Sequence, residues 1–236
     1  LSKDALGGGV CASEGKANPL RATFAISQTA IAAGAKLYRG TPVLGLSGTI
    51  GDFSIKTARG TFKAEKVINT AGAKAADIAE MLGMKIEIGG FPLQVSVTEP
   101  IAPLIPHLVY SAAGKLSLKQ AANGACIIGG GWAADQRDNG HLVTNPVNFV
   151  GNMAIAAGVV PQIANARTIR SWTAWVNGTS DWRPIIGEAP RIPGFYLALF
   201  PWVGFSAGPM TARIISDLVL GRPPTLNLDG ISVLAD

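Results

Sequence analysis

The sequence is poor in charged residues, which make up 15% of its 236 positions, against about a quarter in typical globular domains. The 48% of hydrophobic residues therefore predict a large core, or surface that something else covers. The formal net charge is +5, but the lysines and arginines form no cluster and do not alternate with aromatic residues. This pattern argues against a nucleic-acid-binding surface, while the small positive excess is compatible with an anionic ligand.

Reactive and metal-binding side chains are also scarce. The sequence has two cysteines, Cys11 and Cys126, and two histidines, His107 and His141, all far apart along the chain. They provide neither a disulfide framework nor the clustered ligands of a metal site, and they give little basis for a Ser-His-Asp triad. Unpaired cysteines are typical of a reducing compartment, so we expect a cytoplasmic protein without a bound metal.

Long apolar runs and nucleotide-binding fingerprints are missing as well. No apolar run reaches the ~18 residues that span a bilayer, so no transmembrane segment is predicted. No Walker A sequence occurs. The stretch GGGVCA (7–12) matches GxGxxA in form, but LSKDAL before it is too short and polar for the required strand. No helix opens directly after it either, and we reject it as a phosphate-binding loop.

The patterns that are present predict alternating helices and strands. Asn18 and Pro19 are typical of a helix start and Gly34 of a helix end, which predicts a helix over 17–34. Period-two alternation of apolar residues and intervening glycine-containing turns predict the strands that follow. The expected elements of this region are strands at 36–39, 42–47, 52–57 and 61–69 and a helix over 73–82.

From about Lys85 to Gly131 the pattern changes to strands of a second sheet, in KIEIGGFPLQVSVTEP, KLSLKQA and GACIIGGGWAA. A helix over 145–166 follows, and we expect Pro161 to break or kink it because proline cannot continue the hydrogen-bond ladder. The last expected elements are strands at 168–178 and 194–201 and a helix over 206–220. This order predicts a mixed α/β fold (α+β in part) with two lobes, the first discontinuous in sequence.

The stretch WVGFSAGP (202–209) places an apolar, glycine-bearing loop at the start of the last helix. A helix start leaves backbone N–H groups unpaired and carries partial positive charge, and Gly204 lets a ligand approach the backbone closely. Such a loop suits electron-rich ligand oxygens, with Trp202 and Phe205 as an apolar wall. The alternative is a terminal helix that only packs against the core. Its apolar face comprises Met210, Ile214, Ile215, Leu218 and Leu220, with Asp217 off that face.

A second candidate is VINTAG (67–72), an apolar strand that ends in small residues and a glycine before a helix. Ligands of open α/β sheets bind at the carboxyl ends of strands, and Thr70, Ala71 and Gly72 can present backbone donors there. An ordinary strand-to-helix turn is the alternative. A third stretch, TSDWRPIIGEAP (179–190), predicts an ordered loop in which Asp181 caps a turn.

Taken together and in this order, these stretches resemble the FAD-dependent oxidoreductases of the D-amino-acid oxidase superfamily, such as glycine and sarcosine oxidases. GGGVCASEGKANPLRATFAISQTAIAAGA looks like the family's glycine-rich turn and Pro-Leu-Arg helix, and GTPVLGL like its strand near the adenine end of FAD. VINTAG, QVSVTEP, ACIIGGGW, RSWTAWVNGTSDWRPIIG and WVGFSAGP are similar to further family segments. Within this family, the stretches GGGW and KQAANG resemble the flavin subunits of opine and hydroxyproline dehydrogenases most.

The resemblance implies FAD as cofactor and oxidation of the C–N bond of an amino acid or secondary amine, by hydride transfer to flavin N5. It implies no particular catalytic side chain. The cofactor-binding residues that it implies are Val43, Thr70, Ala71, Gly72, Val203, Gly204, Phe205 and Ser206. The candidates for the wall of the substrate pocket are Gln94, Trp132 and Trp175; ordinary core or sheet positions are the alternative for these three.

The resemblance also implies a domain plan. Residues 1–84 and 170–236 correspond to parts of an FAD-binding, Rossmann-like lobe, and residues 85–169 to an inserted mixed or antiparallel β-sheet that binds substrate. The sequence is expected to begin after the family's first βαβ unit, which carries GxGxxG. Two positions depart from the family pattern: Val176 stands at the carboxylate-binding arginine of glycine oxidase-like members, and Val203 at the flavin-facing histidine.

These departures leave three hypotheses open. The first is an FAD-dependent oxidoreductase that acts on a small amino-acid or amine substrate, with a partner subunit or a second copy as its protein partner. The second is a non-catalytic binding or assembly subunit, or an inactive fragment, with the same fold. The third is an unrelated α/β enzyme in which the matches arise by chance.

Overall fold

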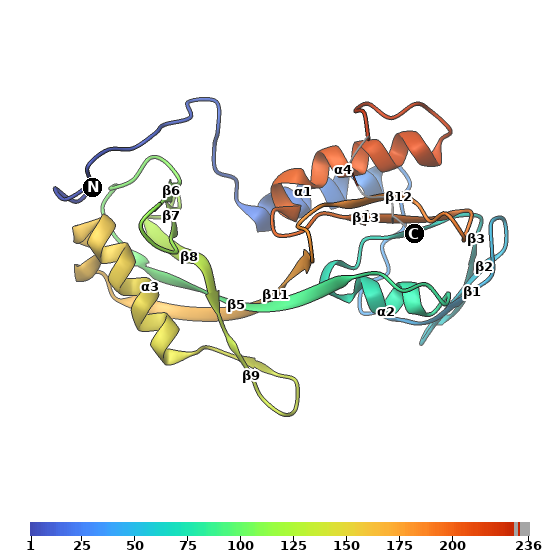
Figure 1. Cartoon of the computed structure of the whole chain (residues 1–236), viewed down its shortest axis with the longest axis horizontal. Coiled ribbons are helices and arrows are strands. Elements are labelled where there is room, and N and C mark those ends of the chain that lie inside the picture. The colour runs from blue at the N-terminus through green and yellow to red at the C-terminus, as the bar shows by residue number, and fades with distance from the viewer. Residues whose placement is uncertain (229–230, 232–236) are drawn as a thin grey trace. The chain divides into compact units, whose positions relative to one another are not determined.

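A computed structural model describes residues 1–228 and 231 of the chain (Figure 1). The chain divides into two compact units, and each is made of two separate stretches of sequence. Unit 1 consists of Leu1–Ala30 and Pro92–Trp175, and unit 2 of Ile31–Phe91 and Val176–Asp236. The chain therefore leaves unit 2 after residue 91 and returns to it at residue 176. Residues 92–175, which belong to unit 1, are thus an insertion in the sequence of unit 2.

Unit 2 is built around a three-stranded sheet of order β12-β13-β4. The strands are β4 (Val67–Asn69), β12 (Ile185–Glu188) and β13 (Phe195–Leu199). β13 runs parallel to β4 and antiparallel to β12. Side chains alternate between the two faces of a strand, and the run from 195 to 199 is apolar on both faces. We therefore expect β13 to be covered on both sides.

Helices cover the two faces of this sheet. On one face, Tyr196 and Ile186 pack with Ile214 and Ile215 of α4 (Gly204–Val219). On the other, Phe195, Leu197 and Leu199 join a larger core with α2 (Ala75–Glu80). That core also receives residues of an antiparallel sheet, β1 (Val43–Ser47), β2 (Phe53–Thr57) and β3 (Gly60–Ala64). The side chain of Phe53 is completely buried there.

Unit 1 contains most of a five-stranded sheet of order β11-β5-β8-β7-β6. Its strands are β5 (Ile88–Pro100), β6 (Val109–Tyr110), β7 (Ser117–Gln120), β8 (Ala125–Ala133) and β11 (Thr168–Thr179). The helix α3 (Pro146–Val159) packs on β8, and its Ala156 joins Leu118, Cys126 and Ile128 in a buried cluster. A small hairpin, β9 (Asp135–Gln136) and β10 (Leu142–Val143), precedes α3.

The first helix, α1 (Pro19–Ala32), is capped as the sequence predicts, because Asn18 Oδ1 accepts a hydrogen bond from the Arg21 N–H at 3.1 Å. None of its residues is buried. The chain before it is attached to unit 1 by Lys16, whose Nζ donates to the Gln120 carbonyl at 2.7 Å. Within the described part of the chain, no helix is long and apolar enough to cross a membrane.

Several element boundaries differ from the sequence prediction. Residues 36–39 form no strand, and the single strand expected at 61–69 is two strands, β3 and β4. The helix predicted over 73–82 begins as a 3-10 turn, Gly72–Lys74, and then continues as α2. The predicted break at Pro161 is confirmed, because α3 ends at Val159 and a separate 3-10 helix, Pro161–Asn165, follows. The stretch expected to be only a loop at 179–190 contains β12.

Candidate functional site

Two of the predicted ligand-binding turns meet at one edge of the unit 2 sheet. β4 and β13 are parallel neighbours, with Asn69 opposite Leu197, so both strands end at the same edge. The turn 70–72 follows β4 directly, and residues 203–206 follow β13 after a short connection. Ligands of open α/β sheets bind at such carboxyl edges. Two segments far apart in the sequence therefore create one candidate site, which we call the carboxyl-edge site.

The turn after β4 is shaped by Asn69, a residue that no sequence pattern singled out. Its side chain is 3% exposed. Its Nδ2 donates to the Ala75 carbonyl at 2.9 Å, and its Oδ1 accepts from the Ala71 N–H at 3.1 Å. The Ala71 N–H is thus engaged within the chain and not offered to a ligand. Thr70 is exposed, and Gly72 has φ +57°, a value that glycine adopts at little cost.

The second turn differs from the prediction in that Gly204, Phe205 and Ser206 already belong to the first turn of α4. Val203 is the residue before the helix, and no side chain caps the helix start. The first turn contains no acidic residue. The N–H groups of residues 204–206 therefore lie at a helix start that carries partial positive charge and no side-chain cap. This arrangement favours an electron-rich ligand group next to Ser206.

Three aromatic rings contact one another in series, and the last of them, Trp202, lies just before this helix start. Phe91 and Trp182 are stacked with centroids 5.8 Å apart and an interplanar angle of 22°. Trp182 and Trp202 meet edge to face, again at 5.8 Å, with an angle of 85°. The sequence predicted Trp202 as an apolar wall, but it gave no sign of Phe91 and Trp182. No spacing rule links residues 91, 182 and 202, because only the fold brings them together.

The remaining predicted cofactor residue, Val43, lies elsewhere in unit 2. It opens β1 and faces Thr57 of β2, beside a register shift between Val43 and Gly45. Its side chain is half-buried. Val43 therefore belongs to the antiparallel sheet and not to the strand pair that forms the carboxyl-edge site.

The three predicted substrate-wall residues belong to unit 1. Gln94 and Trp132 are cross-strand neighbours on β5 and β8. Gln94 is 2% exposed and binds the backbone of Asn145 twice: its Oε1 accepts from the Asn145 N–H at 2.7 Å, and its Nε2 donates to the Asn145 carbonyl at 3.2 Å. Trp175, on β11, is half exposed. Gln94 thereby positions the start of α3, because Asn145 is the N-cap of that helix.

Trp132 is fixed by contacts within unit 1. Its Nε1 donates to the Lys115 carbonyl at 2.7 Å. Its ring lies so close to Gly151 of α3 that a Cβ at that glycine would come within 2.8 Å of two ring atoms. Trp132 therefore packs β8 against α3.

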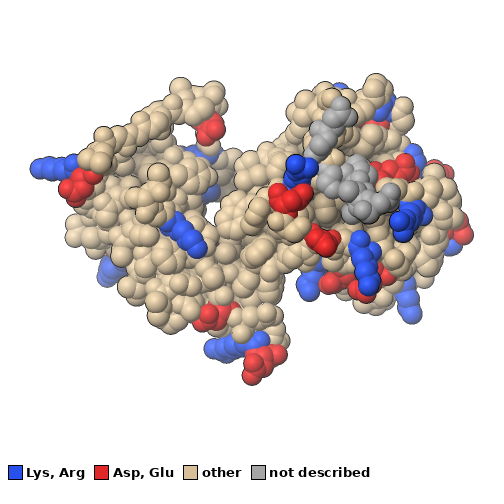
Figure 2. Space-filling view, viewed as in Figure 1, with Lys and Arg blue, Asp and Glu red and all other residues tan. Residues whose placement is uncertain are grey.

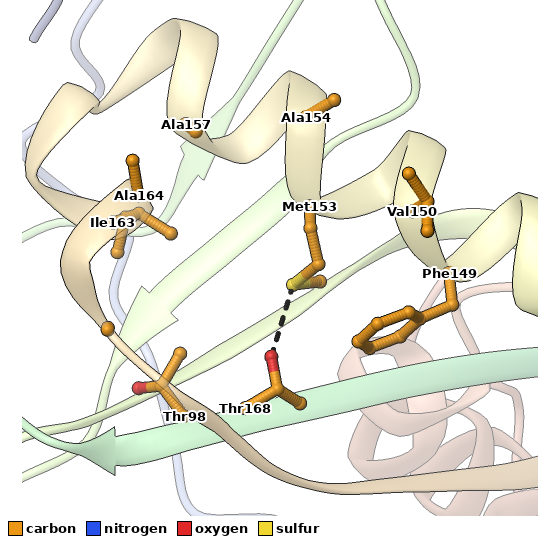
Figure 3. Close-up of a pocket in the computed structure, with 10 residues that line it drawn as sticks. Thr98, Phe149, Val150, Met153, Ala154, Ala157, Ile163, Ala164 and Thr168 are labelled. Carbon is orange, nitrogen blue, oxygen red and sulfur yellow. Dashed lines mark hydrogen bonds between the residues drawn. The ribbon is translucent and has the colours of Figure 1, made fainter.

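A cavity of about 340 Å³ lies in unit 1 between α3 and the strands β5 and β11. Figure 3 shows Phe149, Met153 and Thr168 turned toward it, with the Thr168 hydroxyl 3.6 Å from the Met153 sulfur. The other hydroxyl, on Thr98, donates to the Glu99 carbonyl at 2.8 Å and accepts from the Cys126 N–H at 3.0 Å. No lining residue is titratable, so this cavity offers no acid or base for catalysis.

Charges are sparse at both candidate regions. On the face that Figure 2 shows, acidic and basic side chains are scattered, and most of the surface is neither. No group of three or more His, Cys, Asp or Glu side chains gathers within the described residues. The shifted groups lie outside the carboxyl-edge site. Burial, followed by the carboxylate of Glu188, raises the pKa of Tyr196, and burial raises the pKa of the Cys126 thiol.

One shifted group, Asp217, lies on α4 itself. Asp217, expected off the apolar face, is only 5% exposed. The Thr225 hydroxyl donates to its Oδ2 at 2.6 Å, and Arg213 Nε lies 3.4 Å from the same oxygen. The hydrogen bond from Thr225, reinforced by the charge of Arg213, lowers the pKa of Asp217. The carboxylate thus ties the chain after α4 back to the helix.

This lowered pKa predicts a loss of stability in acid. The folded state stabilises the ionised form of Asp217, whose pKa is therefore lower in the folded than in the unfolded chain. The contribution of Asp217 to the free energy of unfolding is present above the unfolded pKa of about 4 and is lost as the pH falls from there through the folded pKa. Urea unfolding at pH 7 and pH 3 should show a smaller acid loss for Asp217→Asn than for the wild type. The exposed acid Asp138 provides the control, because Asp138→Asn should keep the wild-type acid loss. Equal acid losses in all three proteins would contradict the assignment.

Comparison with known proteins shows the family to which the chain belongs. The family of FAD dependent oxidoreductases known as DAO matches residues 1–218, and the chain belongs to this family. Glycine oxidase from Geobacillus kaustophilus (strain HTA426) is 26% identical over 99% of the chain and 61% of its own length. One of the subunits of opine oxidase from Agrobacterium tumefaciens (strain Ach5) is 26% identical over 84% of the chain and 51% of its own length.

The fold gives the same relationship. The crystal structure of L-proline dehydrogenase from P. horikoshii superposes with a TM-score of 0.81 at 27% identity, over 88% of this chain and 57% of that one. The mixed α/β fold with antiparallel sheets thus matches part of the fold of DAO-family oxidoreductases. The chain spans about half the length of the curated relatives that it matches.

Proposed function

We propose that this chain contributes FAD and substrate binding to an oxidoreductase that oxidises the C–N bond of an amino acid or secondary amine. The observation that carries the proposal is the carboxyl-edge site, where the β4 turn and the start of α4 lie at the same edge of a parallel strand pair. In this proposal unit 2 is part of a Rossmann-like FAD-binding lobe, and the sheet of unit 1 is the substrate lobe. The domain plan 1–84, 85–169 and 170–236 stays a proposal, and it differs from the compact units in assigning Leu1–Ala30 to the FAD-binding lobe.

The residues present fit part of a flavin nucleotide. The uncapped start of α4 supplies N–H donors at Gly204, Phe205 and Ser206, where a pyrimidine ring with electron-rich oxygens and developing negative charge is best stabilised. Gly72 has no side chain to oppose a close ligand. We assign the approach to the dinucleotide to the 70–72 turn, with Val43 toward the adenine. Ala71 is the exception, because its N–H is engaged by Asn69.

When bound, FAD would supply, at flavin N5, the acceptor for a hydride from the substrate carbon. The chain's own part is to bind, orient and exclude water. The carboxyl-edge site contains no acid or base of its own among residues 70–72 and 203–206, which suits a substrate whose amine binds neutral. Gln94, Trp132 and Trp175 are proposed for the substrate side.

Two of the relatives, from opine oxidase and sarcosine oxidase, are named as subunits. This supports a partner subunit for this chain, and a homo-oligomer is the alternative.

The first experiment is a visible absorbance spectrum of the purified chain before and after FAD is added and excess FAD is removed. We expect a retained flavin spectrum, followed by bleaching when a suitable amine is supplied without oxygen. A protein that stays colourless at every FAD concentration tested would favour the alternative function, a non-catalytic subunit with the same fold.

The variant Ser206→Asp sharpens this test because stability and binding should change in opposite directions. A carboxylate in the first turn of α4 can cap the helix and interact with its dipole, which stabilises the chain by about 0.3–1 kcal/mol. The same carboxylate competes for the N–H donors that would hold the flavin oxygens, so FAD affinity should fall about tenfold. Ser206→Asn is the neutral control and should weaken FAD binding much less. Unchanged FAD affinity in Ser206→Asp would remove α4 from the cofactor site.

A further inference from the structure

The aromatic residues beside the carboxyl-edge site have an unusual backbone. Trp182 has φ +59° and Trp202 has φ +60°, and within the described residues they are the only non-glycine positions with positive φ. This left-handed region is unfavourable for a bulky side chain, and strained residues of this kind concentrate at ligand-binding positions. Both tryptophans are in loops that follow strands, Trp182 after β11 and Trp202 after β13.

Hydrogen bonds hold both loops in place. The Thr179 hydroxyl donates to the Arg183 carbonyl at 2.9 Å, and the Arg183 N–H donates to Asp181 Oδ1 at 3.0 Å, which closes the loop around Trp182. The Trp202 N–H donates to the Asn177 carbonyl at 3.0 Å. The two rings are therefore presented in a fixed arrangement, and a ligand that uses them does not have to order them first.

The rings form a corner. The Trp182 ring is stacked on Phe91 and meets Trp202 almost at right angles. Even so, Phe91, Trp182 and Trp202 are 42%, 52% and 46% exposed, and the neighbouring Phe205 is 52% exposed. The cation–π contact found in the described residues, Arg170 over Trp172, lies in unit 1 and leaves this corner untouched. Large aromatic surface thus stays open to solvent next to the first turn of α4.

We infer that this aromatic corner binds the ring of a substrate, and that the substrate is an alicyclic or aromatic amine rather than glycine or another small unbranched amine. The inference rests on the proposed function, because it places the substrate beside the cofactor-binding start of α4. Perpendicular indoles accept a planar or cyclic group by stacking on one ring and edge contact with the other, an arrangement that adds affinity beyond the area buried. A methyl group is too small to contact both rings.

Calorimetric titration with two N-substituted glycines tests the inference directly. N-benzylglycine carries a ring, and sarcosine, which has a methyl group in its place, is the matched ligand. We expect the wild type to bind N-benzylglycine about tenfold more tightly than sarcosine. Trp182→Leu and Trp202→Leu should each remove most of this preference while sarcosine affinity changes less than about twofold. The control is Trp172→Phe, in unit 1, which should keep the preference.

The titrations are run on the chain as purified and on the chain with added FAD, so that this inference and the proposed function fail separately. No preference for N-benzylglycine in either preparation overturns the inference, even if FAD binds and sarcosine is oxidised. A preference that depends on Trp182 and Trp202 supports it, even if the chain fails to retain FAD. If the two leucine variants weaken FAD binding and leave N-benzylglycine affinity intact, the corner stacks on the cofactor and the substrate assignment is wrong. Far-ultraviolet circular dichroism and a cooperative urea transition confirm that the variants fold.

Discussion

Replacing Gly130 by alanine is expected to destabilise unit 1 by about 3 kcal/mol or more, because two separate costs coincide. Gly130 has φ +128°, a conformation that L-residues with a Cβ rarely adopt. A Cβ there would also lie 2.6 Å from the backbone nitrogen of Leu116 and 2.6 Å from the carbonyl carbon of Lys115. Backbone atoms cannot rotate away as a side chain can. β7 and β8 would have to separate, which disrupts the buried cluster beneath α3.

The neighbouring Gly129 provides a control in the same strand. A Cβ at Gly129 would meet only side-chain atoms, Ser117 Oγ at 3.3 Å and Val95 Cγ2 at 3.4 Å, and its φ lies outside the positive region. Gly129→Ala should therefore cost about 1 kcal/mol or less. Urea denaturation of the two variants measures the difference. Equal urea midpoints for Gly130→Ala and Gly129→Ala would mean that the backbone at Lys115–Leu116 leaves room for a Cβ at Gly130.

The variant Asn69→Ala is expected to have the second large effect, on stability and on the cofactor site together. It removes the partner of the Ala75 carbonyl and of the Ala71 N–H. Leaving buried polar groups unpaired costs about 1–3 kcal/mol. The turn between β4 and α2 would also lose its anchor, so we expect FAD affinity to fall at least about tenfold, because a cofactor site depends on accurately held backbone groups.

Thermal unfolding and FAD titration on the same samples separate the two effects. Thr70→Ala is the stability control, because the Thr70 side chain is exposed, and its midpoint should match that of the wild type. Asn69→Asp keeps an acceptor for the Ala71 N–H but turns a buried carboxylate oxygen toward the Ala75 carbonyl, so its midpoint should fall at least as far as that of Asn69→Ala. If Asn69→Ala lowers the midpoint and leaves FAD affinity unchanged, the 70–72 turn does not contact the cofactor.

The elements that the sequence predicted well are those with local signals. α1 begins at Pro19, directly after Asn18, as expected from a cap followed by proline. α3 begins in the same way, with Asn145 Oδ1 accepting from the Asn148 N–H at 2.9 Å, and it ends before Pro161. These signals depend on residues within a few positions of each other, so one sequence is enough to recognise them.

The failures have a different physical origin. β12 is a strand because it pairs with β13 and is buried under α4, whereas the surrounding proline and glycines locally favour a loop. Asp217 is buried because Thr225 comes back to it, which helical periodicity cannot show. Asn69 and Trp182 lie within recognised segments, yet their roles depend on partners that the fold supplies. The two turns of the carboxyl-edge site could be predicted, but the side chains that shape them could not.

The interrupted course of the chain also sets an order for its synthesis on the ribosome. β4 leaves the exit tunnel early, but its parallel partner β13 emerges only after all of residues 92–175. Unit 1 is nearly continuous in this stretch, so it can fold before β13 is available to pair with β4. The entropic cost of bringing ends together grows only slowly with loop length, and a folded insertion holds its two ends within a limited distance of each other. The carboxyl-edge site is thus completed late, once the nascent chain has passed α4, and the apolar strand β4 lacks its parallel partner until then.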